Sequence, residues 1–238
     1  MIIRNRKEIR GNKVIWQYLS WDKFFDLLIN KELYLSRTSE MTDKNECCIS
    51  QKNVERIIEY INRIVPNNTL SLSIDDSLKN RSFINCWSMS RNESYALWKI
   101  YLSNAKSGVA IKTTVSHLEN AIKEGCKNDD IYIMPVHYGS SISIFNLDMD
   151  TQPIQKQVDI WRLATKLQAY QYENEVRLIC LCRDDSTGKR IKISSLDFID
   201  ELYFSPFNRC FDDTYTKVLQ KIGGGLEKKV KKSGIDDQ

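Results

Sequence analysis

The sequence is poor in histidine, and this scarcity excludes several common kinds of active site. Only His117 and His137 occur among the 238 residues, and neither has a metal-ligand companion at helical or strand spacing. We therefore expect no metal site. A Ser–His–Asp or Cys–His arrangement would need one of these two histidines, and the sequence contains no nucleophile elbow.

Other signatures are missing as well. The sequence has no P-loop and no GxGxxG motif, no apolar run long enough to cross a membrane, and no signal-peptide core behind its charged first residues. Its seven cysteines include no C-x-x-C pair, which favours reduced, mostly buried thiols over a disulfide frame or a zinc site. We expect a cytoplasmic protein with no membrane partner. The net charge of +4 permits an anionic partner without demanding one.

Short strand and helix patterns fill the chain without the strict order of βαβ units. This arrangement predicts an α+β fold, with a mixed, mainly antiparallel central sheet and flanking helices. We expect one domain over residues 1–238, in which residues 1–13 form a flexible arm or an edge strand. The expected strands are 14–19, 33–36, 82–88, 108–112, 131–138, 170–182, 190–193, 199–205 and 226–232. The expected helices are 20–30, 52–65, 93–103, 114–124, 154–170 and 213–222.

Two of these segments carry more specific predictions. Pro135 places the strand 131–138 at an edge of the sheet, because proline cannot donate to a strand ladder. The segment 190–193 is the expected hairpin partner of 170–182. On the helix 154–170, Leu167 is expected to face inward, and Arg162 and Lys166 are expected to face solvent.

The most apolar strand-like run begins beside two glutamates. Alternate side chains of a strand share a face, so Glu173, Glu175 and Arg177 are predicted to point the same way. Carboxylates this close repel each other, and one pKa should rise unless Arg177 or a ligand neutralises them. The pattern fits a structural ion-pair cluster, and it also fits an active site, where perturbed carboxylates gather.

Further polar and aromatic residues leave alternatives open. Trp98 and Tyr101 fit the core, or an aromatic wall for a planar ligand ring. Arg37 fits a solvated loop, or a phosphate clamp, because its guanidinium fork matches phosphate geometry. Asp43 and Glu46 fit a loop cap or a second carboxylate pair near the site.

Three blocks of the sequence carry a family resemblance. The first block is Val14–Ser20 with Phe24, Leu28, Leu33–Arg37 and Asp43–Glu46. The second is Asn85–Ser90 with Glu93–Tyr101 and Gly108–Ile111, and the third is Lys166 with Tyr172–Leu178. Their content and order resemble a bacterial family of unknown function, DUF2971. Gln17 stands where the family usually has a basic residue, and Lys44 where it usually has proline, which weakens any role tied to those positions.

The same order is distantly similar to that of the ADP-ribosyltransferases: an aromatic strand with a helix, then a strand bearing serine, then a strand opening with Glu-x-Glu. The similarity implies an ADP-ribosyltransferase-like fold and NAD as a substrate. It gives Glu175 the catalytic role, with Glu173 and Arg177 in support. The residues that it implies for NAD binding are Tyr18, Ser36, Arg37, Ser88, Trp98 and Tyr101.

The functional expectation is therefore an enzyme that uses NAD to modify nucleic acid or protein, as a toxin or a phage-defence effector. An antitoxin or another defence-system component is the partner that the similarity implies. A non-catalytic binding or sensor module is one alternative. A metal-dependent nuclease is another, with Asp43, Glu46, Glu173 and Glu175 as Mg²⁺ ligands.

Overall fold

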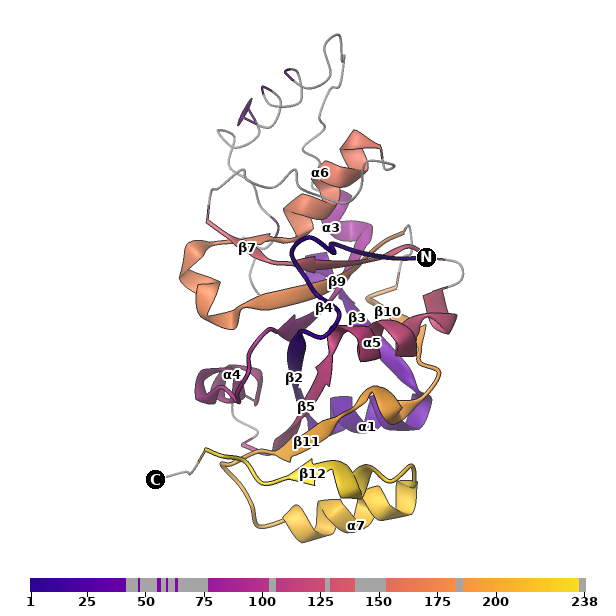
Figure 1. The fold of residues 1–238 in the computed structure, drawn as a ribbon, viewed down its shortest axis with the longest axis vertical. Helices are drawn as coiled ribbons and strands as arrows, with labels where there is room; N and C mark the ends of the chain where they lie inside the picture. Colours follow the sequence, from indigo (N-terminus) through magenta and orange to yellow (C-terminus); the bar gives the residue numbers. More distant parts are fainter. Residues whose placement is uncertain are drawn as a thin grey trace.

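A mixed sheet of ten strands runs through the middle of the computed structural model, with helices on both faces (Figure 1). The structure describes residues 1–41, 47, 55–56, 59, 63, 77–102, 106–126, 129–139, 153–182 and 186–235. Most strand pairs are antiparallel, and β1–β6 and β11–β12 are parallel. The expected α+β class with a mixed, mainly antiparallel sheet is confirmed.

The strands are short segments rich in β-branched and aromatic residues, as the sequence predicts. They are β1 (Ile2–Arg4), β2 (Val14–Ser20), β3 (Glu32–Arg37), β4 (Ser82–Ser88), β5 (Gly108–Thr114), β6 (Ile131–Pro135), β7 (His137–Tyr138), β8 (Thr165–Lys166), β9 (Glu175–Leu181), β10 (Gly188–Lys192), β11 (Glu201–Phe204) and β12 (Val230–Lys231). The main sheet has the order β1-β6-β9-β4-β2-β5-β11-β12, and β3 and β10 branch from β4. The pair β7–β8 forms a separate small sheet.

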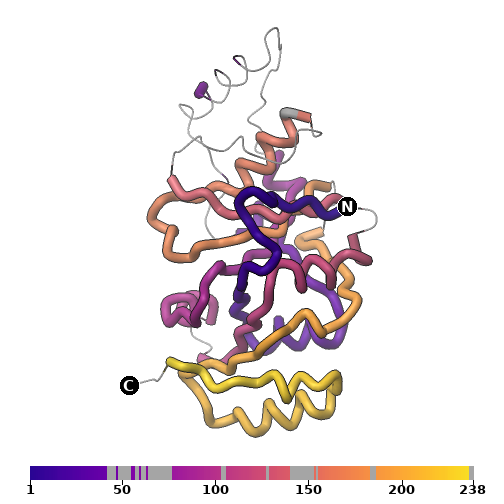
Figure 2. The backbone as a smooth tube through the Cα atoms, viewed as in Figure 1, coloured from indigo at the N-terminus to yellow at the C-terminus, as the bar shows by residue number. Residues whose placement is uncertain are grey.

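Within the described residues, the helices are α1 (Trp21–Asn30), α3 (Ser77–Asn80), α4 (Tyr95–Leu102), α5 (Val115–Ile122), α6 (Ile154–Leu163) and α7 (Asp212–Ile222). Short 3-10 segments lie between them, including η3 (Gln168–Glu173). Thr114 caps α5 by accepting a hydrogen bond from the backbone N–H of His117. Figure 2 shows α7 and β12, in yellow, at one end of the molecule.

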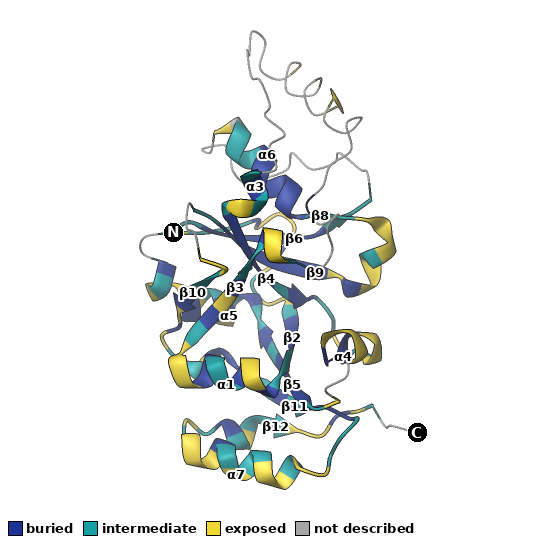
Figure 3. Cartoon of the chain, turned by 180° about the vertical axis from the view of Figure 1, so that it is seen from behind, coloured by how far each residue is buried: buried dark blue, intermediate teal, exposed yellow. Residues whose placement is uncertain are grey.

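Alternation along the strands assigns each helix to a face of the sheet. Val176 and Leu178 of β9 pack in one hydrophobic cluster with α1, α5 and Leu219 of α7. Ile179 points the other way, into a second cluster with α3 and α6. On that second face, Trp16 of β2 packs with α4 in a third cluster. Figure 3 shows exposed residues on α4 and α7, as expected of helices that bury one side.

Three expectations about pairing and length are wrong. The expected helix 154–170 ends at Leu163, because the chain turns at Ala164 into β8, which pairs with β7. The strand β6 is central rather than an edge, since β1 pairs with its outer side and β9 with its inner side. The segment 188–192 pairs with β3, and it is not the hairpin partner of β9.

The side-chain directions expected for 162–167 are also wrong. Arg162 is buried, Leu167 is exposed, and Lys166 is half-buried within the site described below. The expected helix 52–65 lies largely outside the described residues, as do Asp43 and Glu46. Among the described helices, none combines the length and apolar character that a membrane span requires.

Candidate functional site

A cavity of about 1260 Å³ lies where the sheet divides. The end of β4 at Ser88 pairs with Trp16 of β2, while Ile84 pairs with Ser36 of β3. Because β4 is shared in this way, β2 and β3 diverge from it. Side chains from β2, β3, β4, α4, η3 and β9 line the resulting cavity. The opening is therefore a product of strand pairing between distant segments.

Most of the residues predicted for the site meet in this cavity, and three do not. Its lining includes the side chains predicted for catalysis or NAD binding at six positions: Tyr18, Ser36, Ser88, Tyr101, Glu173 and Glu175. Among the described residues, Arg37, Trp98 and Arg177 do not belong to the lining. Trp98 and Arg177 are fully buried directly behind it.

The register of three adjacent strands brings the predicted motifs together. On β4, Ser88 is opposite Glu175 of β9 on one side and opposite Trp16 of β2 on the other. The serine-bearing strand thus lies between the aromatic strand and the strand that begins with Glu175. Ser88 also donates a hydrogen bond from Oγ to the backbone oxygen of Glu173, at 2.8 Å.

The two glutamates do not lie on one strand, which corrects the expected alternation. Glu173 ends η3, Asn174 adopts a left-handed conformation with φ of 43°, and β9 begins at Glu175. The backbone N–H of Met89 donates to Asn174 O at 2.7 Å, and the Asn174 amide donates back to Met89 O. This turn still directs both carboxylates to the same place.

Lys166 joins the two carboxylates, and sequence reasoning placed it in solvent. Its Nζ lies 2.7 Å from Glu173 Oε2 and 3.3 Å from Glu175 Oε1. The ammonium also lies 4.6 Å from the centre of the Tyr170 ring. The third family block begins with Lys166 and could have placed this residue in the site. The helical pattern expected for 154–170 assigned Lys166 to the solvent-facing side instead.

Arg177 is the second cation of the cluster, and it has no exposed surface. Its Nε donates to Glu175 Oε2 at 2.8 Å, and its Nη1 donates to the backbone oxygen of Leu163 at 2.7 Å. The arginine therefore ties β9 to the end of α6. It supports Glu175 from the side away from the cavity.

The electrostatic environment separates the two carboxyl groups. Burial, and a hydrogen bond with Glu175, raise the pKa of Glu173 to about 7 despite the opposing charge of Lys166. Burial pushes the pKa of Glu175 upward, but Arg177, Glu173 and Lys166 outweigh it and lower this pKa to about 2. Near neutral pH the pair therefore holds one permanent negative charge and one exchangeable proton.

Aromatic side chains from β2 and α4 form another part of the site. Tyr18 stacks on Tyr101 with ring centres 6.2 Å apart and planes 10° apart. Trp98 meets Tyr18 edge-on at 4.9 Å and donates from Nε1 to Glu93. Burial raises the pKa of Tyr18 to about 12, so its hydroxyl stays protonated, and it accepts a hydrogen bond from the Ser94 backbone N–H.

Arg37, the expected phosphate clamp, is directed elsewhere. Its Nε donates to Ser186 O at 2.7 Å, and its backbone N–H donates to Thr187 O. Its guanidinium lies 5.5 Å from the centre of the Phe83 ring. The basic residues among the described lining are Lys23, Lys166 and Arg190.

Two comparisons bear on the family. Residues 97–178 match the model of a family described as a protein of unknown function, DUF2971. This match supports the family assignment for the segment that contains Tyr101, Lys166 and both glutamates. No curated protein matches the sequence. The matched family has no described activity, so the chemistry must be argued from the cavity itself.

Proposed function

We propose that this chain is an ADP-ribosyltransferase-like enzyme. It would cleave the bond between nicotinamide and ribose in NAD and transfer ADP-ribose to a nucleic-acid or protein acceptor. One observation carries the proposal: a charged Glu175 and a protonatable Glu173 share one end of a cavity that has stacked tyrosines on its wall. Glycosyl transfer uses two carboxyl groups in different states, one ionised and one able to exchange a proton.

The bond-breaking step uses the charge of Glu175. As the bond breaks, its electron pair moves to the pyridinium nitrogen, so nicotinamide leaves as a neutral molecule. Positive charge then develops on the ribose, and an anion held in place stabilises that charge. Lys166 and Arg177 hold the Glu175 carboxylate in position and keep it ionised.

The transfer step uses Glu173. An oxygen or nitrogen nucleophile of the acceptor forms a new bond to the ribose carbon and gives up a proton. Glu173 accepts this proton, and its pKa of about 7 suits a general base near neutral pH. Lys166, 2.7 Å away, favours the ionised form of Glu173 that does this work.

The cavity also offers groups for binding NAD. Tyr101 presents a flat ring for the nicotinamide, the buried Tyr18 supports this ring by stacking on it, and Ser36 and Ser88 offer hydroxyls to the ribose. Because Arg37 turns toward Ser186, we assign the pyrophosphate to Lys23 and Arg190, which line the cavity.

The carboxylate cluster favours this proposal over a nuclease. A Mg²⁺ ion shared by Glu173 and Glu175 would need the position that Lys166 already occupies between them. Asp43 and Glu46, the other two ligands of that alternative, lie outside the described residues.

The test is NAD turnover by the purified protein, with and without cellular nucleic acid and protein as acceptors. We expect release of nicotinamide and labelling of an acceptor, with a rate about 100- to 1000-fold lower in Glu175→Gln because the anion is lost. Glu201→Gln is the matched control. Glu201 also pairs with a lysine, Lys112, but it does not line the cavity, so its turnover should equal that of the wild type.

Two results would contradict the proposal. Binding of NAD without turnover in any extract would support the sensor alternative. Turnover that is equal in Glu175→Gln and the wild type would mean that another site does the chemistry.

A further inference from the structure

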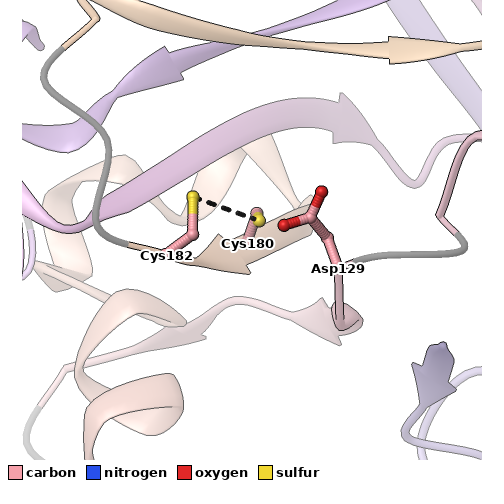
Figure 4. A group of neighbouring side chains, drawn as sticks. All are labelled: Asp129, Cys180 and Cys182. Atoms are coloured by element: carbon pink, nitrogen blue, oxygen red, sulfur yellow. Dashed lines mark hydrogen bonds between the residues drawn. The ribbon is translucent and has the colours of Figure 1, made fainter.

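A second cluster of reactive side chains lies away from the cavity, at the far end of β9. Cys180 belongs to β9, and Cys182 follows directly after this strand. Asp129 precedes the neighbouring strand β6, in which Ile131 is opposite Cys180. Figure 4 shows the Asp129 carboxylate beside the Cys180 thiol, with the Cys182 thiol on its other side. None of the three belongs to the cavity lining, so the cluster is independent of the proposed function.

The two sulfur atoms have the separation of ligands in a tetrahedral metal centre, and a carboxylate oxygen lies near them. The two sulfur atoms lie 3.9 Å apart, and one ligand atom from each of the three residues lies within 4.8 Å of the others. Two thiolates bound to Zn²⁺ at about 2.3 Å, with a tetrahedral angle between them, lie about 3.8 Å apart. The sulfurs therefore already stand at the separation of a bound pair.

A neighbouring lysine completes the charge balance. Lys189 Nζ lies 3.0 Å from Asp129 Oδ2, and its charge also acts on both thiols. Two thiolates, one carboxylate, one lysine and a divalent cation sum to zero charge. A second-shell partner that orients a ligand carboxylate is a regular part of metal sites.

We propose that Cys180, Cys182 and Asp129 bind a thiophilic divalent cation of the zinc type, with a solvent molecule as the fourth ligand. Cys182 and Asp129 are half-buried, so the ion and its solvent ligand reach the site from the side on which these two residues are exposed. The ion joins the end of β9 to the segment before β6. The N-terminal amine also donates to Asp129 O at 2.7 Å, so an ion that fixes Asp129 also holds the first residues of the chain.

Metal binding must displace protons from the thiols. The metal competes with these protons, so affinity should fall as the pH falls and binding should release protons to the buffer.

The test uses the full chain, kept reduced and freed of metal, and titrated with Co²⁺ as a spectroscopic probe and then with Zn²⁺. We expect one equivalent of Co²⁺ to produce a thiolate charge-transfer band that Zn²⁺ abolishes, and Zn²⁺ to raise the Tm. Cys182→Ser and Asp129→Asn should weaken binding by about 10- to 100-fold or more, since even second-shell losses reach that range.

Matched controls separate the site from general effects. Cys210→Ser removes an exposed thiol elsewhere, and Asp130→Asn removes the carboxylate next to Asp129 that pairs with Lys156. Both should bind Co²⁺ as the wild type does. Absence of the charge-transfer band in the folded wild type overturns the proposal, and so does equal binding by Cys182→Ser and the wild type. Circular dichroism of each variant checks that it is folded.

Discussion

At the scale of single residues, Glu173 and Glu175 differ because their neighbours differ. Glu175 lies between two cations, Lys166 and Arg177, and the buried arginine is fixed by a backbone oxygen of α6. Glu173 has Lys166 and the competing charge of Glu175. Burial raises the pKa of both carboxyl groups. Neighbouring charges outweigh this effect at Glu175, whereas Lys166 offsets it only in part at Glu173. The proton of the pair accordingly resides on Glu173.

This difference predicts how stability depends on pH. The pKa of Glu173 is about 7 in the folded chain against 4.5 for the free group, so the folded state binds more protons between these values. Its stabilising contribution is complete below pH 4.5 and is lost as the pH rises through 7. The full difference between these pKa values corresponds to about 3 kcal/mol. Solvent screening of the pair, which lines the cavity, reduces the expected fall in the free energy of unfolding to on the order of 2 kcal/mol across this window. Glu173→Gln should flatten that fall in urea denaturation.

The titration of Glu175 does not contribute to the fall in the free energy of unfolding between pH 4.5 and 7. Glu175 has a lowered pKa, so it changes its charge below the window. Glu201→Gln is the control, because the pKa of Glu201 is also lowered, despite its burial, by Tyr203 and Lys112. A slope in Glu173→Gln equal to that of the wild type would show that Glu173 is not the titrating group.

At the scale of elements, one residue sets the geometry between η3 and β9. Asn174 has a φ of 43°, a conformation that glycine and asparagine adopt readily and β-branched residues do not. The turn separates the two glutamates into different elements while both reach Lys166. The strand pattern of 170–182 did not reveal this turn, because asparagine is also tolerated within a strand.

Two substitutions test this role of Asn174. Both Asn174→Gly and Asn174→Val lose the side-chain hydrogen bond to Met89 O, so glycine is the matched control. Valine adds backbone strain, and it should lower the free energy of unfolding by about 1–2 kcal/mol more than glycine does. Chemical denaturation measures the difference. Equal stability of the two variants would contradict the importance of the left-handed turn.

At the scale of the whole molecule, the sheet connects distant parts of the chain. The first strand pairs with β6, β10 pairs with β3, and β11 pairs with β5. Three hydrophobic clusters pack against this one sheet. Strands β2, β3, β4 and β5 pair among themselves, but β9, β10 and β11 from the C-terminal half complete the sheet on either side of them, so the whole sheet needs both halves of the described chain.

We therefore expect the chain to unfold in a single cooperative transition. The buried tryptophans include Trp21 and Trp87 in the first cluster and Trp16 and Trp98 in the third, so fluorescence reports on both. Its transition in urea should coincide with that of far-ultraviolet circular dichroism. Two separated transitions would mean that the clusters unfold independently and would contradict the expectation of one domain.

Sequence patterns were sufficient for elements whose cause is local. The strands at 14–20, 82–88 and 108–114 and the helix α7 are close to their expected positions, because side-chain periodicity and capping act within a few residues. Strand alternation identified the two glutamates as a candidate cluster, whereas the serine of β4 and the tyrosines of the cavity lining were implied by the family resemblance. The match to a family of unknown function covers part of this set.

The sequence alone thus determined the class of fold and most of the site's residue types, since these depend on local periodicity and on a recognisable order of motifs. Strand partners, the inward direction of Lys166, the outward direction of Arg37 and the meeting of Asp129 with two thiols were decided by the tertiary structure. These features depend on pairing between segments far apart in the chain. Such pairing is selected by the packing of the whole core, and no short stretch of sequence contains it.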